Sequence, residues 1–501
     1  MRPLSLAFVL VLTLTLTPYV LAVIAPPPGM AFLGTFHYAD DFYNYLSYAQ
    51  QAEDGSFLLH NKVLLADHPP ALINLEWWLV GQVSRLLGGG HLLLAYRIFA
   101  VLATFGFLWA SDLWLRRLGL PDTHRLPALL LVATGGGLGG VLFTLTTRDL
   151  TECLDLYAGL FPFLGLVTNP HFTAGTTLLL LGLLLFETGR GVRGIAAATA
   201  MGTATALVRP YDFVLMVLIR GLSVALLEQP RRWVAALAPL AGLLPVTAYL
   251  YWLFYRNPAF SFYAQTDYVF PPLSDLCLAL APVVPLGFLG FWPTPAGDAA
   301  SRRARLHLLV WAGFGVVVVL ARPVHFSLQF LGGIGLPFLA LGALGLSRWR
   351  PAITYVAVVV FSTSFLATLR FVSTPRVYWM APRSELAVAD ALRAVCRPGD
   401  ILFSPPGVGL YAYGVSACRA FLSHAVGPGY RQRLEFGRRF GQMSPEDRLA
   451  LLDSFRVSLL LLPGDAGLRP TAWLGANAPF VRRELGRAEL GFSLYAREGR
   501  P

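Results

Sequence analysis

Apolar windows of about 20 residues recur along the chain and predict a polytopic α-helical membrane protein, because that length lets a helix cross the hydrocarbon core of a bilayer. We expect about eleven spans, at residues 4–25, 92–115, 126–145, 171–188, 194–209, 212–228, 233–254, 273–292, 306–321, 326–346 and 351–371. Residues 71–88 are apolar but contain Glu76 and Arg85, which favours a helix lying at the membrane interface.

The first window has two interpretations. Arg2, a long apolar run and the small residues near Ala25 resemble a secretory signal peptide. The run over residues 4–24 is nevertheless about 20 residues long, which is enough to span a bilayer and longer than the apolar core of most signal peptides. We therefore favour a retained first span.

Arginines predict the orientation of the spans. With the N-terminus inside, the connections expected in the cytoplasm each contain two or three arginines, as the positive-inside rule requires; they are residues 116–125, 189–193, 229–232, 293–305 and 347–350. The opposite face has single arginines, namely Arg148, Arg209, Arg256 and Arg322. Loops 26–70 and 146–171, and everything after about residue 372, are then expected outside the cell.

The pattern changes after residue 371, where charge rises and apolar runs shorten. Residues 384–396 have helical periodicity, and residues 401–403 and 457–462 are typical of short buried strands. Ser444 before Pro445 is typical of a helix start, so residues 444–454 are expected to be helical. The sequence therefore predicts a transmembrane domain at 1–371, with external loop 26–70, and a small extracytoplasmic α/β domain at 372–501.

Composition supports the membrane assignment, since 55% of residues are hydrophobic and only 13% are charged. The net charge of +11 comes almost entirely from arginine, and Lys62 is the only lysine. The arginines form no dense patch with interleaved aromatic residues, so we expect no nucleic-acid partner. Cysteines 153, 277, 396 and 418 lack metal-ligand spacing, and whether Cys396 and Cys418 form a disulfide is left open. No P-loop or dinucleotide fingerprint is present.

Asp40 and Asp41 are the foremost candidate catalytic residues. They follow the first span in an external loop, among aromatic and hydrogen-bonding side chains, and charge is costly near lipid unless it has a function. Two adjacent carboxylates can act as a general base that activates a hydroxyl, with a divalent cation as a candidate cofactor. The simpler interpretation is a solvated loop whose acids cap a helix at 42–51.

Basic side chains on the same face are candidates for binding a phosphate group, since arginine binds phosphate in a bidentate manner. We select Arg322 with His325, and Arg256, for this role. His68, before Pro69 and Pro70, could also donate to a phosphate oxygen. Each of these residues could instead be a structural or snorkelling side chain at the membrane edge.

A second polar group, in the loop after the third predicted span, offers candidate ligands for a metal or an acceptor. It comprises Arg148, Asp149, Glu152 and His171. His171 is as easily explained as a hydrogen-bonded histidine at a helix entrance.

The layout resembles the GT-C superfamily of membrane glycosyltransferases, which includes protein O-mannosyltransferases and the aminoarabinose transferases of lipid A. Asp40-Asp41-Phe42-Tyr43 occupies the place of the acidic first-loop motif, with Asp in place of the frequent Glu. His68-Pro69-Pro70 is similar to the family's basic-Pro-Pro segment, with His in place of Lys. Further similar segments are Arg322–Leu336, which includes most of the run Phe330–Pro337, and Ile401–Pro406, Arg419–His424 and Gly429–Arg433.

The resemblance implies an inverting transfer of a sugar from a polyprenyl-phosphate carrier to an acceptor hydroxyl, at the outer face of the bacterial cytoplasmic membrane. Asp40, supported by Asp41, would take the proton, and Arg322 would stabilise the leaving phosphate. The implied partners are the lipid-linked sugar, a glycan, lipid or protein acceptor, and membrane lipid.

Two other functions remain open from the sequence alone. A transporter or flippase of lipid-linked saccharides would also have many spans, but it would be expected to have inverted repeats or broken helices around a midplane cavity. A non-catalytic scaffold would not need acids and arginines on one face of the membrane.

Overall fold

The structure is a computed structural model that describes residues 2–36, 38–146, 159–189, 191–265, 272–291, 299–321, 327–366, 379–425, 427–463, 479–483, 485 and 491–498. Two compact units account for the chain. The first comprises residues 1–21, 97–256 and 263–374, and the second comprises residues 22–96, 257–262 and 375–501. The whole of the predicted external loop 26–70 thus groups with the C-terminal segment, whereas the predicted domain boundary at residue 371 stays a prediction.

The first unit is helical. Its elements are α1 (Arg2–Ile24), α4 (Leu92–Arg117), α5 (Asp122–Thr134), α6 (Gly139–Leu145), α8 (Pro162–Thr168), α9 (Pro170–Thr188), α10 (Gly191–Val208), α11 (Pro210–Leu227), η2 (Pro230–Arg232), α12 (Trp233–Ala241), α13 (Leu244–Tyr255), α14 (Ser261–Gln265), α15 (Leu273–Leu280), α16 (Val283–Phe288), η3 (Leu289–Phe291), α17 (Ala299–Ala321), η4 (Ser327–Leu331), α18 (Gly335–Leu346) and α19 (Pro351–Phe361). Helices α1, α4 and α14 each extend across a boundary between the two units.

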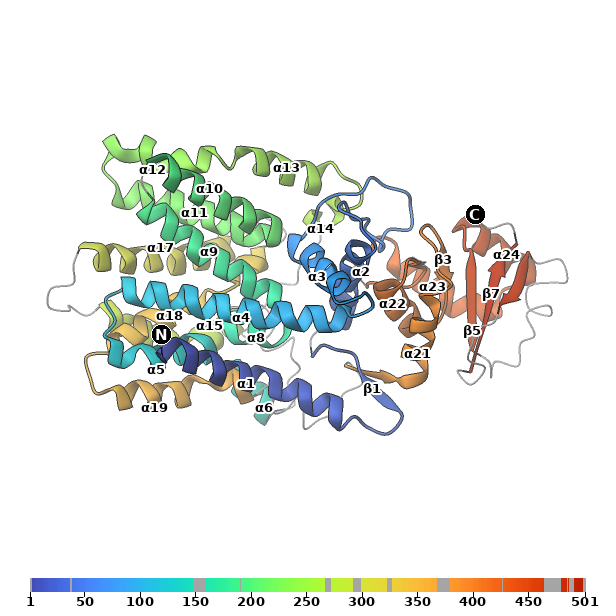
Figure 1. Cartoon of the computed structure of the whole chain (residues 1–501), viewed down its shortest axis with the longest axis horizontal. Coiled ribbons are helices and arrows are strands. Elements are labelled where there is room, and N and C mark those ends of the chain that lie inside the picture. Colours follow the sequence, from blue (N-terminus) through green and yellow to red (C-terminus); the bar gives the residue numbers. More distant parts are fainter. Residues whose placement is uncertain are drawn as a thin grey trace. The chain divides into compact units, whose positions relative to one another are not determined.

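Apolar side chains fill the interior of this unit. The long helices α9, α10 and α11 lie alongside one another (Figure 1), and α18 packs against α5, α16 and α17. Within the part of the chain that the structure describes, six helices are long and apolar enough to cross a membrane, or up to eight if each of two bent helix pairs is one span. The polytopic helical fold is therefore confirmed, and the count of eleven spans stays a prediction.

Two predicted spans are broken. The window at 126–145 consists of α5 and α6, which meet at 60°, and the window at 233–254 consists of α12 and α13, which meet at 52°. The first break coincides with the run from Gly135 to Gly140, where a β-carbon on Gly137 would lie 1.9 Å from the carbonyl oxygen of Ala279. Glycine is needed there for close packing, and this run ends the helix despite its apolar pattern.

The second unit contains two sheets with helices around them. Its elements are β1 (Met30–Phe32), α2 (Ala39–Glu53), α3 (Leu75–Leu86), β2 (Met380–Pro382), α21 (Arg383–Leu392), β3 (Ile401–Phe403), α22 (Pro406–Val415), β4 (Arg419–Ala420), α23 (Tyr430–Arg439), η5 (Phe440–Gln442), α24 (Pro445–Ser454), β5 (Leu459–Pro463), β6 (Phe480–Arg483) and β7 (Phe492–Arg497). Strands β1 and β2 form an antiparallel pair.

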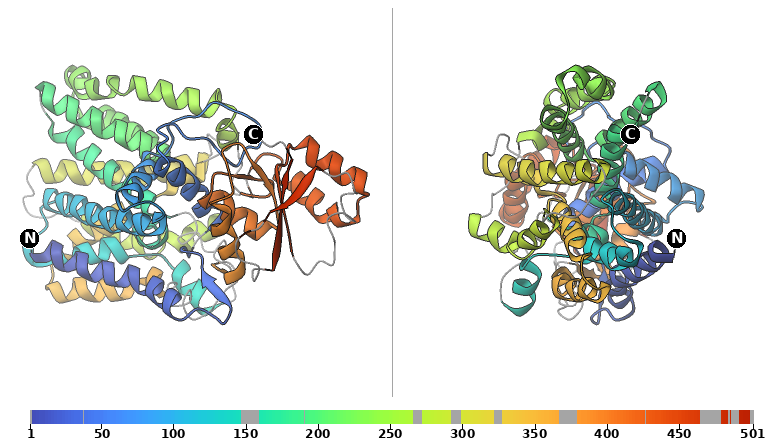
Figure 2. Two further views of the ribbon diagram at one scale, coloured as in Figure 1. Left: turned by 45° about the vertical axis from the view of Figure 1, so that its right-hand side comes forward. Right: turned by 90° about the vertical axis from the view of Figure 1, so that its left-hand side faces the viewer.

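The larger sheet has the strand order β4-β3-β5-β7-β6. Strand β3 is parallel to β4 and β5, while β7 is antiparallel to β5 and β6. Helix α22 connects β3 to β4, which lies on one side of β3. Helices α23 and α24 connect β4 to β5, which lies on the other side of β3. The two connections therefore run in opposite directions across the sheet. Right-handed crossovers then place these helices on opposite faces, and Figure 2 shows helices on both sides of the sheet. Coverage on both faces explains the apolar runs of β3 and β5.

The elements predicted for the C-terminal segment are confirmed, with ends that shift by a few residues. The helix expected at 384–396 is α21, and the strands expected at 401–403 and 457–462 are β3 and β5. Ser444 caps α24 as expected, because its hydroxyl accepts a hydrogen bond from the backbone N–H of Asp447. Cys396 and Cys418 form a disulfide, which resolves the alternative left open by the sequence.

Candidate functional site

Helix α2 holds Asp40 and Asp41 in its first turn. The residue before the helix, Tyr38, has a φ of 31°, and its side chain makes no capping hydrogen bond. The backbone N–H groups of Asp40 and Asp41 donate instead to the carboxylate of Asp40. A helix N-terminus has unpaired backbone N–H groups and favours negative charge. The acids therefore satisfy backbone donors at the start of α2 and are stabilised there.

The carboxylate pair has a partner from a distant part of the chain. Nε2 of His424 lies 2.7 Å from Oδ1 of Asp41 and 4.0 Å from Oδ2 of Asp40. The His424 side chain is only 4% exposed, whereas those of Asp40 and Asp41 are 29% and 42% exposed. The imidazole therefore lies behind the two acids, and the carboxylates remain open to a substrate.

Burial and mutual repulsion alter the protonation of this group. Burial raises the pKa of Asp40 above its ordinary value, the charge of Asp41 raises it further, and His424 partly offsets both effects. Burial lowers the pKa of His424, but the hydrogen bond to Asp41 and the two carboxylate charges outweigh it, so the net shift is upward. The arrangement favours an imidazolium that is paired with Asp41 and that limits the rise in the pKa of Asp40.

The loop that carries His424 is fixed by helix α23. Arg433 is buried, and its guanidinium donates from Nε to the carbonyl of Phe421 and from Nη1 to that of Pro428, each at 2.7 Å. These two carbonyls flank His424 in the sequence. Tyr430, at the start of the same helix, has a pKa raised by burial and by the nearby charge of Asp40. The phenol therefore borders the acids as well.

Sequence reasoning did not select His424 as a site residue. It lies 383 residues from Asp41, so no spacing rule connects them. Its only signal was its place at the end of the segment Arg419–His424, which resembled a known family.

The acids and the imidazole can carry out proton transfer. Asp41 is hydrogen-bonded to His424, whereas Asp40 lies 4.0 Å from the imidazole and is better placed to accept a proton. Among the residues described, no cluster of three or more His, Cys, Asp or Glu side chains has a metal-binding arrangement.

His68 differs from its predicted role. Its Nε2 accepts a hydrogen bond from the backbone N–H of Asn61 at 3.0 Å, and its Nδ1 donates to the carbonyl of Ala66 at 2.9 Å. Burial also lowers the pKa of His68, which favours the neutral ring. Both nitrogens thus stabilise the loop itself, and no ring N–H faces a phosphate. The reason is local: the turn before Pro69 needs these backbone groups satisfied.

The other predicted residues are not assembled with the acids in one unit. Arg256 is exposed at the end of α13, and His171 is buried in the first turn of α9, with its ring 4.5 Å from that of Phe172; both belong to the first unit. The remaining candidates, Arg148, Asp149, Glu152, Arg322 and His325, lie outside the described residues.

The first unit contains a small pocket between the segment that begins at residue 159 and the segment that begins at residue 327. Gly333 donates to the carbonyl of Gly159 at 3.0 Å, which joins the segment after residue 158 to the segment after residue 326. Arg209 lines the pocket; it is buried and paired with Asp212, and its guanidinium carbon lies 4.1 Å from the centre of the Phe172 ring.

Comparison with known proteins identifies the fold. No family model matches the sequence, and no curated protein matches it. Solved structures that match include ArnT from Cupriavidus metallidurans bound to undecaprenyl phosphate, with 14% identity over 97% of each chain and a TM-score of 0.54. The apo form of that protein matches with 13% identity over 91% of this chain and 92% of the other, and a TM-score of 0.51.

An oligosaccharyltransferase from Archaeoglobus fulgidus, tethered to an acceptor peptide with an NVT sequon, matches with 12% identity. That match covers 99% of this chain and 74% of the other, with a TM-score of 0.51. The chain therefore shares the fold of ArnT and of this oligosaccharyltransferase, in keeping with the polytopic helical layout predicted from the sequence.

Proposed function

We propose that this protein is an inverting glycosyltransferase that moves a sugar from a polyprenyl-phosphate carrier to an acceptor hydroxyl at the outer face of the cytoplasmic membrane. The observation that carries the proposal is the partly exposed carboxylate pair, Asp40 and Asp41, backed by the buried ring of His424. The fold supports it, because one protein with this fold was solved with undecaprenyl phosphate and another with an acceptor peptide.

In the proposed reaction, Asp40 removes the proton of the acceptor hydroxyl. The oxygen attacks the anomeric carbon from the side opposite the phosphate, a new carbon–oxygen bond forms, and the bond between the sugar and the phosphate oxygen breaks. The proton ends on Asp40, and the electron pair leaves with the polyprenyl phosphate. His424 lowers the pKa of Asp40 and so favours its ionised form beforehand, against the opposing charge of Asp41.

The leaving phosphate gains charge as the bond breaks, and a preorganised cation lowers the barrier at that point. Arg322 stays our first choice for this role, with His325 and Arg256 as further candidates. We omit His68, whose ring nitrogens are both engaged within its own loop. Arg148, Asp149, Glu152 and His171 stay candidates for contact with the acceptor.

The disulfide between Cys396 and Cys418 supports the proposed orientation. Disulfides form in oxidising compartments and are rare in the cytosol. Both cysteines belong to the unit that contains the acids, so a reaction outside the cytoplasm fits the bond and the arginine pattern equally well.

Broken spans are a feature expected of the alternative, a transporter. The break between α5 and α6 is tightly packed, however, because β-carbons on Gly136 and Gly140 would overlap with Ser364 and Thr363. A filled break offers no cavity for a saccharide, so we prefer the enzyme.

The test uses purified full-length protein with a polyprenyl-phosphate sugar that is radiolabelled in the sugar. An enzyme consumes the donor, whereas a transporter or scaffold leaves it intact. We expect Asp40→Asn to lower the transfer rate by about 10²-fold or more, as the loss of a general base does. Asp67→Asn is the matched control, because Asp67 lies in the same external loop with its side chain 80% exposed. Full activity in a folded Asp40→Asn protein would exclude the proposed mechanism.

A further inference from the structure

The only lysine of the chain is buried. Lys62 is 5% exposed and lies in the second unit, in the loop between α2 and α3. Burying an ammonium group is costly unless its donors are satisfied, so its place in the interior requires a structural or functional reason.

All three N–H donors of Lys62 have an acceptor. Its Nζ lies 2.6 Å from Oε1 of Gln50, 2.6 Å from the carbonyl oxygen of Ser416 and 3.3 Å from that of Tyr413. Tyr413 and Ser416 are at the C-terminal end of α22, where helix carbonyls lack intrahelical partners and the helix dipole favours positive charge. A compact ammonium with rotatable donors suits this corner better than the planar fork of arginine.

Both groups that Lys62 connects lead to the carboxylate site. Gln50 belongs to α2, the helix that begins with Asp40 and Asp41. On the other side, the chain continues from Ser416 through β4 to His424. Helix α22 also contacts the acid directly, because the phenol of Tyr413 donates to the carbonyl of Asp40 at 3.3 Å.

We propose that Lys62 is a positioning residue that holds α2 against the end of α22, and thereby keeps the two aspartates in register with His424. This inference rests on the proposed function for its catalytic meaning. The ammonium touches neither acid and would act only through the two segments that it joins.

The hydrogen bonds of the Lys62 ammonium are sensitive to pH, because burial and nearby charges alter its protonation. Burial lowers the pKa of Lys62 to about 7, and the charge of Asp54 partly opposes that shift. Asp54 accepts a hydrogen bond from Gln50, and Glu53 and Arg393 also act on its charge. A deprotonated lysine has two N–H donors for three acceptors, so one contact is lost as the pH rises through 7.

Two variants separate positioning from general stabilisation. Lys62→Met removes the three hydrogen bonds. Arg448→Met is the matched control, since Arg448 is also buried in the second unit and also holds backbone carbonyls, but these are the carbonyls of Phe440 and Gly441, which lie outside α2 and α22. We expect Lys62→Met to lower kcat by about 10²-fold with little change in the KM for the donor, as small misplacements of catalytic groups do. Arg448→Met should keep kcat within about threefold.

A spectroscopic readout tests the inference without activity. In protein labelled with ¹⁵N-histidine, the ring signals of His424 are those lost in His424→Gln. We expect Lys62→Met, but not Arg448→Met, to lower the pKa of His424 toward its ordinary value, because the hydrogen bond to Asp41 loosens. An unchanged titration of His424 together with an unchanged kcat in Lys62→Met would overturn the inference.

The wild-type protein provides a check that needs no variant. With ¹³C-labelled lysine, the chain gives a single ε-carbon resonance, which we expect to titrate near pH 7. A midpoint near 10.5 would show that burial does not shift the pKa of Lys62 and would overturn the pH dependence of this contact. If the wild type transfers no sugar but Lys62→Met still alters His424, the proposed function fails and the positioning role stands.

Discussion

Asp40 and Asp41 are neighbours in the sequence, but they have different environments. Asp41 accepts the hydrogen bond of His424, while Asp40 accepts backbone N–H groups of its own helix turn and is held at 4.0 Å from the imidazole. The difference supports the roles proposed for the pair, with Asp40 as the base and Asp41 as the partner of the buried imidazole. Because both residues are aspartate, the sequence alone cannot reveal this difference.

The pH dependence of transfer tests the contribution of His424. The imidazolium lowers the pKa of Asp40, so its removal in His424→Gln should raise that pKa further above 3.8. Because the base must be ionised, the acid limb of the rate profile should move to higher pH in the variant. Measurement of kcat from pH 4 to 8 checks the prediction, and a limb that stays in place would mean that His424 does not act on Asp40.

Lys62 should make stability depend on pH. Its pKa of about 7 in the folded protein lies below the unfolded value of 10.5, so the unfolded chain binds more protons between these values. The free energy of unfolding should therefore rise with pH from about 7 toward 10.5. Thermal unfolding in detergent measures this, and Lys62→Met should lack the rise; a rise of equal size in both proteins would contradict the assignment.

At the scale of elements, α2 and α22 are the critical pair. Gly414 of α22 lies directly against Tyr43 of α2, where a β-carbon would come within 2.6 Å of Tyr43 Cδ1 and 2.9 Å of its carbonyl oxygen. The rings of Tyr43 and Tyr411 also pack together, with centres 5.1 Å apart. The absence of a side chain at Gly414 therefore allows the two helices to pack this closely.

A methyl group at this contact should force the helices apart. We expect Gly414→Ala to destabilise the protein by about 1–3 kcal/mol, the usual cost of overpacking, and to lower kcat as the carboxylate helix shifts. Gly441→Ala is the control, because no atom lies within 4 Å of the added carbon. Thermal unfolding and transfer rates of the two variants test this, and equal behaviour would show that the α2–α22 contact can adapt.

Element types were predictable wherever one periodicity dominated. The apolar windows gave the long helices, and Ser444 with Pro445 gave the start of α24. The bend after α5 was missed because a hydropathy window counts glycine as mildly apolar, whereas packing against Ala279 decides where the helix ends. The pairing of His424 with Asp41 was missed because it depends on tertiary structure alone.

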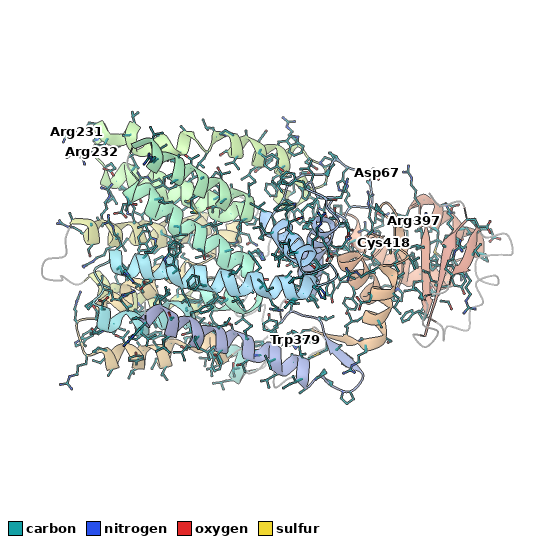
Figure 3. The ribbon with its side chains drawn as sticks, viewed as in Figure 1. Asp67, Arg231, Arg232, Trp379, Arg397 and Cys418 are labelled. Atoms are coloured by element: carbon teal, nitrogen blue, oxygen red, sulfur yellow. A yellow bond between two sulfur atoms is a disulfide. The ribbon has the colours of Figure 1, made fainter. Side chains whose placement is uncertain are left out.

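At the scale of the whole molecule, the arginine pattern makes a topological prediction. Arg231 and Arg232, labelled in Figure 3, are exposed in a connection expected inside the cell, and Phe57 is exposed in the loop expected outside. In a background that lacks Cys153 and Cys277, Phe57→Cys should react with an impermeant thiol reagent on intact cells. Arg232→Cys should react only after the membrane is opened. The reverse pattern would invert the proposed orientation and place the acids in the cytoplasm.

The burial of the one lysine, Lys62, should protect the folded chain from proteases that cleave after lysine. A protease that cleaves only after lysine finds a single target bond within these 501 residues, and in the folded protein that bond is next to a side chain enclosed by α2 and α22. Cleavage would require this corner to open, and the two fragments would be easily resolved by mass. The rate of that cut, measured with and without a lipid-linked sugar, would report how often the carboxylate helix separates from its neighbour.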